Sequence, residues 1–126
     1  CLVEQITKTD PTALLEAPKL QRKLPDTLSY EEIEAIISAI DLSKPEGERN
    51  KAILETMYSC GLRVSEIVSL QISCLYLDSG FIRVIGKGNK ERLVPIGEKA
   101  IRQLEIYLKL VRSHQIIKPG AEDIVF

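Results

Sequence analysis

Residues 72–97 read ISCLYLDSGFIRVIGKGNKERLVPIG and decide the fold class of this chain. Three runs of strand-forming residues, 72–77, 81–85 and 91–95, are separated by the turn-forming sequences Asp-Ser-Gly and Gly-Lys-Gly-Asn-Lys. β-Branched and aromatic side chains favour strands, and short breaks that contain Gly and Asn favour tight turns between them. The stretch therefore predicts a three-stranded antiparallel meander.

Helical patterns precede this meander. Ser29 and Glu32 have the spacing of a capping box at the start of a first helix. A second helix is predicted over residues 48–60, and Gly61 is placed to end it in a left-handed conformation. The residues expected to face inward on these two helices are apolar and helically spaced: Ile33, Ile36, Ile37, Ile40, Ile53, Leu54, Met57 and Tyr58.

Two further helices complete the prediction. A short helix is expected over residues 64–70, with Ile67, Val68 and Leu70 inward. A longer amphipathic helix is expected over residues 97–112, after the meander. The predicted fold is therefore mixed α+β and mainly helical, with helices packed against a small three-stranded antiparallel sheet.

The charges are segregated along the chain. The formal net charge is only −1, but residues 29–48 are mainly acidic and residues 83–92 are mainly basic. A second basic cluster consists of Lys19, Arg22 and Lys23. An acidic protein can therefore present one basic face to a nucleic acid, although most charge runs are only solvated surface.

The sequence does not indicate a membrane protein, a secreted protein, a zinc-binding protein or a disulfide-rich protein. It has no apolar run long enough to span a membrane and no signal peptide, so a soluble, cytoplasmic protein is expected. Its three cysteines and one histidine lack metal-ligand spacing, which predicts neither a zinc site nor a disulfide framework. Because the first residue is Cys rather than Met, the numbering is expected to begin inside a longer polypeptide.

Three prolines indicate the domain organisation. Pro11, Pro18 and Pro25 fall within residues 10–28, where few apolar positions are periodic. Proline disfavours helix, so this stretch is predicted to be an extended linker. Residues 29–126 then form one folded domain.

Arg63 is the first candidate for chemistry. It follows Gly61 at the junction of two predicted helices, where a short connection can direct a long cation into a groove. A planar guanidinium matches two non-bridging oxygens of a phosphate. Position alone leaves a second interpretation open, in which Arg63 lies at a helix end or pairs with Glu66. Glu66 itself is expected to orient Arg63 rather than to act as an acid or base.

The second candidate is the hairpin turn at residues 86–92, which combines glycines with cations. Glycine permits close approach to another polymer, so Lys87 is placed to enter a DNA groove and donate a proton or a hydrogen bond. An ordinary solvated turn is the alternative. The turn lacks the P-loop pattern and precedes a strand rather than a helix, which argues against a nucleotide site.

Taken together, these motifs resemble the catalytic domain of Xer-type tyrosine recombinases, which are phage-type integrases. The resemblance rests on Gly-Leu-Arg-Val-Ser-Glu at residues 61–66, about twenty residues of short strands, and Val-Ile-Gly-Lys-Gly-Asn-Lys-Glu-Arg-Leu-Val-Pro-Ile-Gly at residues 84–97. It extends upstream to Ala-Pro-Lys-Leu at residues 17–20 and downstream to Glu-Asp-Ile-Val-Phe at residues 122–126, and so covers nearly the whole chain.

The resemblance implies a role for each motif. Arg63 matches the first catalytic arginine, which holds the scissile phosphate, and Lys87 matches the hairpin lysine that protonates the leaving 5′ oxygen. Residues 10–28 match the linker to a core-binding domain whose last turns would be residues 1–9. The reaction needs no metal and no cofactor. The DNA contacts expected from the linker and the hairpin come from polar and basic residues: Lys19, Arg22, Lys23, Asn89, Lys90 and Arg92.

One departure from the family pattern is large. A complete recombinase has a later His-x-x-Arg pair and then a nucleophilic tyrosine, whereas His114 is followed by Gln-Ile-Ile. All four tyrosines lie before the expected place of the nucleophile, and packing is expected to explain each of them. The chain is therefore expected to be a truncated catalytic domain, inactive alone.

The resemblance implies that the parent protein cleaves and rejoins duplex DNA through a 3′-phosphotyrosine intermediate, as a tetramer, with or without a second recombinase. Two alternatives remain open. One is a non-catalytic DNA-binding or regulatory protein that reuses the fold, and the other is a helical protein-interaction domain.

Overall fold

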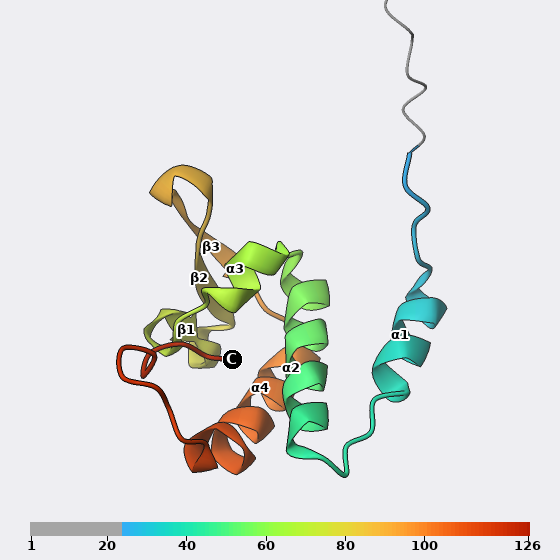
Figure 1. The fold of residues 1–126 in the computed structure, drawn as a ribbon. Helices are drawn as coiled ribbons and strands as arrows, with labels where there is room; N and C mark the ends of the chain where they lie inside the picture. The colour runs from blue at the N-terminus through green and yellow to red at the C-terminus, as the bar shows by residue number, and fades with distance from the viewer. Residues whose placement is uncertain (1–23) are drawn as a thin grey trace, which may run out of the picture.

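The computed structural model describes residues 24–126, which form helices on one side and a small sheet on the other (Figure 1). The α-helices are α1 (Tyr30–Ser38), α2 (Pro45–Cys60), α3 (Val64–Val68) and α4 (Glu98–Leu110). The strands are β1 (Leu75–Tyr76), β2 (Phe81–Ile85) and β3 (Glu91–Pro95). Short 3₁₀ turns are η1 (Ile72–Cys74), η2 (Leu77–Ser79), η3 (Lys87–Asn89) and η4 (Arg112–His114). The predicted fold class is confirmed. The expected domain end at residues 1–9 and most of the expected linker at residues 10–28 lie outside the described residues.

The sheet is an antiparallel meander in the order β1-β2-β3, as predicted. β2 and β3 begin and end where the sequence pattern placed them, and Val84 is paired with Arg92. Because side chains alternate along a strand, Ile82 and Val84 are buried on the inner face while Phe81 is exposed on the outer one.

The expected strand over residues 72–77 is wrong for most of its length. Only β1 is strand, and it lies between the turns η1 and η2. The reason is a contact with the end of the chain. The Asp123 carboxylate accepts hydrogen bonds from the Ser73 amide at 2.9 Å and the Ser73 hydroxyl at 2.6 Å, and the Ile72 amide donates to the Asp123 carbonyl. The amides of Ile72 and Ser73 therefore donate to Asp123 instead of to a neighbouring strand, so the strand cannot extend over these residues.

The capping box of α1 is confirmed, since the Glu32 amide donates to the Ser29 hydroxyl and the Ser29 amide donates to the Glu32 carboxylate. α1 lies beside α2 at the edge of the molecule (Figure 1), so only one narrow side of it is covered. Ile37 is buried, whereas Ile36, predicted to face inward, is exposed.

Helix α2 begins at Pro45, three residues before the predicted start, because proline is well suited to the first turn of a helix. Gly61 ends it with φ 59°, the left-handed conformation that was predicted. The core lies between α2, α4 and the inner face of the sheet, where Ala52, Leu104 and Tyr107 have no exposed surface. Tyr58 was expected inward but is about half exposed.

Helix α3 ends at Val68, earlier than predicted, and Val68 lies on the same exposed face as Val64, one turn earlier. Ile67 and Leu70 are buried as expected, but Val68 is 64% exposed. Leu70 lies beyond the helix, where its carbonyl accepts a 2.9 Å hydrogen bond from the Val125 amide. The tail therefore determines the path of the chain after α3.

Candidate active site

Arg63 lies at the N-cap of α3, where its backbone is extended. The left-handed turn at Gly61 reverses the chain after α2, and the buried side chain of Leu62 anchors the connection in the core. The Arg63 side chain itself is 75% exposed. A short, anchored connection thus presents an accessible guanidinium at the surface, at the end of a helix.

Glu66 is buried directly beneath Arg63. Its side chain is 3% exposed, and its Oε2 accepts a 2.8 Å hydrogen bond from the Arg63 amide. The Arg63 Nη1 lies 3.4 Å from Oε1. The expectation that Glu66 supports Arg63 agrees with this geometry, although the closer partner of the carboxylate is a different arginine.

That partner is Arg92 on β3. Its Nη1 and Nη2 donate to Oε1 and Oε2 of Glu66 at 2.7 and 3.0 Å, which is a two-pronged ion pair. The hydrogen bonds from Arg92, and then from the Arg63 amide, lower the pKa of Glu66 to about 2. The carboxylate is therefore ionised at neutral pH. Arg92 was predicted to contact DNA, but its fork is directed at Glu66.

Lys87 lies in η3, at the tip of the β2–β3 hairpin. The Gly86 amide donates to the Lys90 carbonyl at 2.8 Å, which closes the hairpin, and Gly88 takes φ 75° within the turn. Asn89 also has a positive φ, 57°, a conformation that Asn tolerates better than most residues. Lys87, Asn89 and Lys90 are exposed. The three predicted polar contacts of the tip are thus accessible.

Arg63 and Lys87 line the same cleft, which has a volume of about 540 Å³. The other lining residues are Ser65, Glu66, Ser69, Ile85 and Gly86. A forked cation and an amine facing one space suit a phosphate group with negative charge on several oxygens. Ser65 and Ser69 were not predicted as part of the site, and their spacing of four residues on or beside a short helix was the only available signal. Lys19, Arg22 and Lys23 lie outside the described residues.

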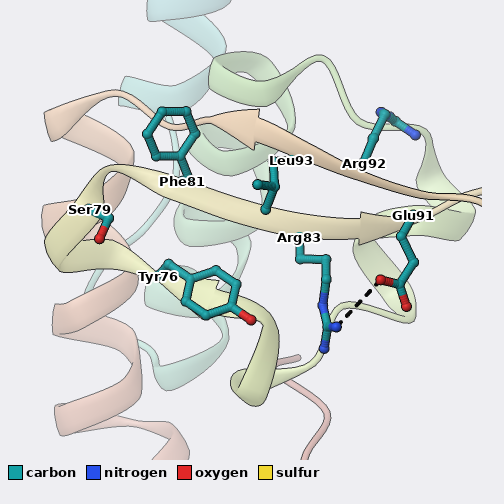
Figure 2. Close-up of a pocket in the computed structure, with 7 residues that line it drawn as sticks. All are labelled: Tyr76, Ser79, Phe81, Arg83, Glu91, Arg92 and Leu93. Atoms are coloured by element: carbon teal, nitrogen blue, oxygen red, sulfur yellow. Dashed lines mark hydrogen bonds and ion pairs between the residues drawn. The ribbon is translucent and has the colours of Figure 1, made fainter.

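A second pocket, of about 500 Å³, lies on the outer face of the sheet (Figure 2). Tyr76, Phe81 and Leu93 provide most of its apolar surface, and the Arg83 Nη1 lies 3.4 Å from the Glu91 Oε2 at its side. It shares no lining residue with the cleft of Arg63 and Lys87. The two arginines of this pocket, Arg83 and Arg92, are each paired with a carboxylate and less exposed than Arg63, and its walls are mainly apolar. The first cleft, which combines Arg63 with the exposed Lys87, is therefore the better phosphate site.

The four tyrosines differ in their surroundings. Tyr107 is fully buried, and burial raises its pKa, so packing explains it as predicted. The other three, Tyr30, Tyr58 and Tyr76, are about half exposed, so packing covers only part of each side chain. The rings of Tyr30 and Tyr58 lie 6.4 Å apart, between α1 and α2.

Residues 24–126 contain neither a metal-ligand cluster nor a membrane-spanning helix. In that range, no three His, Cys, Asp or Glu side chains are grouped so that they could hold a metal ion. None of the helices in the same range is both long and apolar enough to cross a membrane.

Comparison with known proteins identifies the family. A sequence model described as the phage integrase family matches residues 26–124, which include both Arg63 and Lys87. The chain belongs to the phage integrase family. The resemblance to Xer-type tyrosine recombinases is also confirmed, because curated relatives of this chain are tyrosine recombinases XerD.

The XerD of Proteus mirabilis is 49% identical over 98% of this chain, and that of Oceanobacillus iheyensis is 46% identical over 98%. The chain spans 39% and 41% of those two relatives, or about two fifths of their length.

Solved structures of two Xer recombinases have a similar fold. The crystal structure of XerA recombinase superposes with a TM-score of 0.69 and 32% identity, covering 88% of this chain and 37% of that one. XerH site-specific recombinase, bound to a palindromic difH substrate in a post-cleavage complex, gives a TM-score of 0.69 and 29% identity, with 85% and 31% covered.

Proposed function

We propose that the protein containing these residues is a site-specific recombinase that breaks and rejoins duplex DNA through a 3′-phosphotyrosine intermediate. The observation that carries this proposal is the cleft in which Arg63 and Lys87, 24 residues apart in sequence, face one space. Family membership supports it, as does the DNA-bound XerH neighbour. The 126 residues supply two of the cations, and the proposed nucleophile is a tyrosine outside them.

The two cations have separate tasks in this mechanism. The Arg63 guanidinium donates to the non-bridging oxygens of the scissile phosphate and stabilises the charge that develops on them as the tyrosine attacks. The Lys87 ammonium donates its proton to the 5′ oxygen as the phosphorus–oxygen bond breaks. Glu66 takes no part in proton transfer, because hydrogen bonds from Arg92 and from the Arg63 amide keep it ionised.

The exposed hairpin tip is the proposed groove contact. Lys87, Asn89 and Lys90 enter the DNA beside the scissile phosphate, and Lys19, Arg22 and Lys23 of the linker hold the backbone on the other side. Residues 1–9 end a core-binding domain, so that two domains clamp the duplex. The assembly on DNA is a tetramer, with or without a second recombinase, in the cytoplasm.

The test uses the full-length protein and a nicked suicide substrate that traps cleaved DNA. Incubation should give a denaturant-resistant adduct in which the 3′ phosphate is joined to tyrosine. Arg63→Ala should abolish most of the adduct, whereas Arg102→Ala, which removes an exposed arginine of α4, should not. Specific DNA binding with no adduct from the unchanged protein would contradict the proposal and favour a non-catalytic DNA-binding protein.

A further inference from the structure

One buried carboxylate contacts both segments that carry the proposed catalytic cations. The Glu66 carboxylate accepts a 2.8 Å hydrogen bond from the Arg63 amide, at the start of α3. It also accepts hydrogen bonds of 2.7 and 3.0 Å from the two terminal nitrogens of Arg92, on β3. Arg92 lies five residues after Lys87 on the same hairpin. Glu66 therefore joins the segment that carries Arg63 to the segment that carries Lys87.

Gly86 shows how closely the two segments approach. A Cβ added to Gly86 would lie 3.3 Å from the Arg92 Nη1 and 3.4 Å from the Glu66 Oε1. The ion pair thus lies against the backbone of the residue immediately before Lys87. Any change in the Arg92–Glu66 pair should be transmitted to the hairpin tip.

The Arg92–Glu66 pair also affects how strongly the Arg63 guanidinium binds Glu66. A carboxylate that is 3% exposed needs a cation, because an unpaired buried charge is costly. Arg92 supplies that cation through two short bonds, whereas Arg63 makes only one 3.4 Å contact from its side chain. With Glu66 already satisfied, the Arg63 guanidinium remains exposed to the cleft.

We propose that Arg92 is a positioning residue, which through Glu66 holds the Lys87 hairpin against α3 and keeps Arg63 directed at the phosphate. This inference rests on the proposed function, and it gives Arg92 a role other than the DNA contact that the sequence suggested. The competing role predicts different kinetics. A phosphate contact contributes to DNA affinity, whereas a positioning residue contributes to the rate in the assembled complex.

Arg92→Lys in the full-length protein separates the two roles, because lysine keeps the charge but cannot make a two-pronged pair. Single-turnover cleavage at saturating protein should fall by roughly 10²-fold, the cost of a misplacement near 1 Å, while the dissociation constant for DNA stays close to that of the unchanged protein. Unchanged cleavage in Arg92→Lys would overturn the proposal.

Glu66→Gln changes the other member of the Arg92–Glu66 pair, so it tests whether the effect is specific to the Arg92→Lys substitution. It should slow cleavage at saturating protein in the same way. If Arg92 were a DNA contact, releasing it from Glu66 should instead tighten binding and leave cleavage intact, which would contradict the proposal. Arg102→Ala is the control for loss of an exposed arginine.

Hydrogen–deuterium exchange without DNA provides a readout that does not depend on recombination. Arg92→Lys should speed exchange in the peptides over residues 62–66 and 86–92, and leave α4 unchanged. Unchanged exchange over residues 62–66 would overturn the inference even in an active protein. Failure of the unchanged protein to form an adduct would contradict only the proposed function, since the exchange result would still decide whether Arg92 holds the two segments together.

Discussion

The hydroxyl of Tyr107 on α4 donates a 3.1 Å hydrogen bond to the main-chain carbonyl of Val125. Both residues are fully buried, and the Tyr107 ring stacks on Phe126 with centroids 5.2 Å apart. The Arg112 guanidinium holds the same tail by donating to the carbonyls of Ala121 and Ile124. The end of the described chain is thus part of the core rather than a loose extension.

Tyr107→Phe should therefore lower the free energy of unfolding by about 1–3 kcal/mol, because it leaves the buried Val125 carbonyl without its donor. Urea unfolding followed by circular dichroism measures the change. Tyr58→Phe, at a side chain that is about half exposed, is the matched control and should change stability little. Equal effects of the two substitutions would show that the hydrogen bond contributes nothing measurable.

The Glu66 carboxylate should make stability depend on pH in the acid range. Its folded pKa, about 2, lies below the ordinary value of about 4.3 for an unfolded glutamate. The ionised Glu66 therefore contributes its full stabilisation at any pH above the pKa of the unfolded glutamate. That stabilisation is lost as pH falls through about 4 toward 2. Thermal melts from neutral pH to pH 2.5 should fall more steeply for the unchanged protein than for Glu66→Gln. The exposed Glu105→Gln should keep the steep fall, and parallel curves for all three would argue against the prediction.

Arg63→Ala and Lys87→Ala should respond differently to a substrate with sulfur at the 5′-bridging position. Both variants should cleave ordinary DNA roughly 10²-fold or more slowly in the full-length protein. Because a thiolate leaves without a proton, the sulfur substrate should restore most of the rate of Lys87→Ala and little of the rate of Arg63→Ala. Suicide-substrate assays measure both rates. Rescue of neither variant, or of both equally, would show that Lys87 is only a groove contact.

DNA affinity should decline steeply with salt, and Lys90 should account for part of that dependence. Its side chain is exposed at the hairpin tip, where it is placed to neutralise a backbone phosphate. Lys90→Ala should reduce the slope of log K against log salt by about 1. Titrations of the full-length protein between about 50 and 200 mM salt measure it. Lys109→Ala, which removes an exposed lysine of α4, should leave the slope unchanged. If Lys109→Ala reduced the slope as much as Lys90→Ala, the salt dependence would reflect overall charge rather than a phosphate contact of Lys90.

The sequence by itself determined the elements whose signals are local. The capping pair Ser29 and Glu32, the left-handed Gly61 and the limits of β2 and β3 all depend on neighbouring residues, so their patterns predicted them. The family resemblance likewise depended on two short motifs at a given spacing, and it singled out Arg63 and Lys87 as the candidate pair.

Only the tertiary structure decided how distant residues are partnered. The strand expected over residues 72–77 was interrupted by Asp123, and the chain after α3 was fixed by the hydrogen bond from Val125 to Leu70. Arg92 appeared to be one more hairpin cation until the strand register placed it on the same face as Val84, within reach of Glu66. A linear pattern reports charge and periodicity. It does not report which of several carboxylates a guanidinium meets, because that depends on packing between segments 26 residues apart.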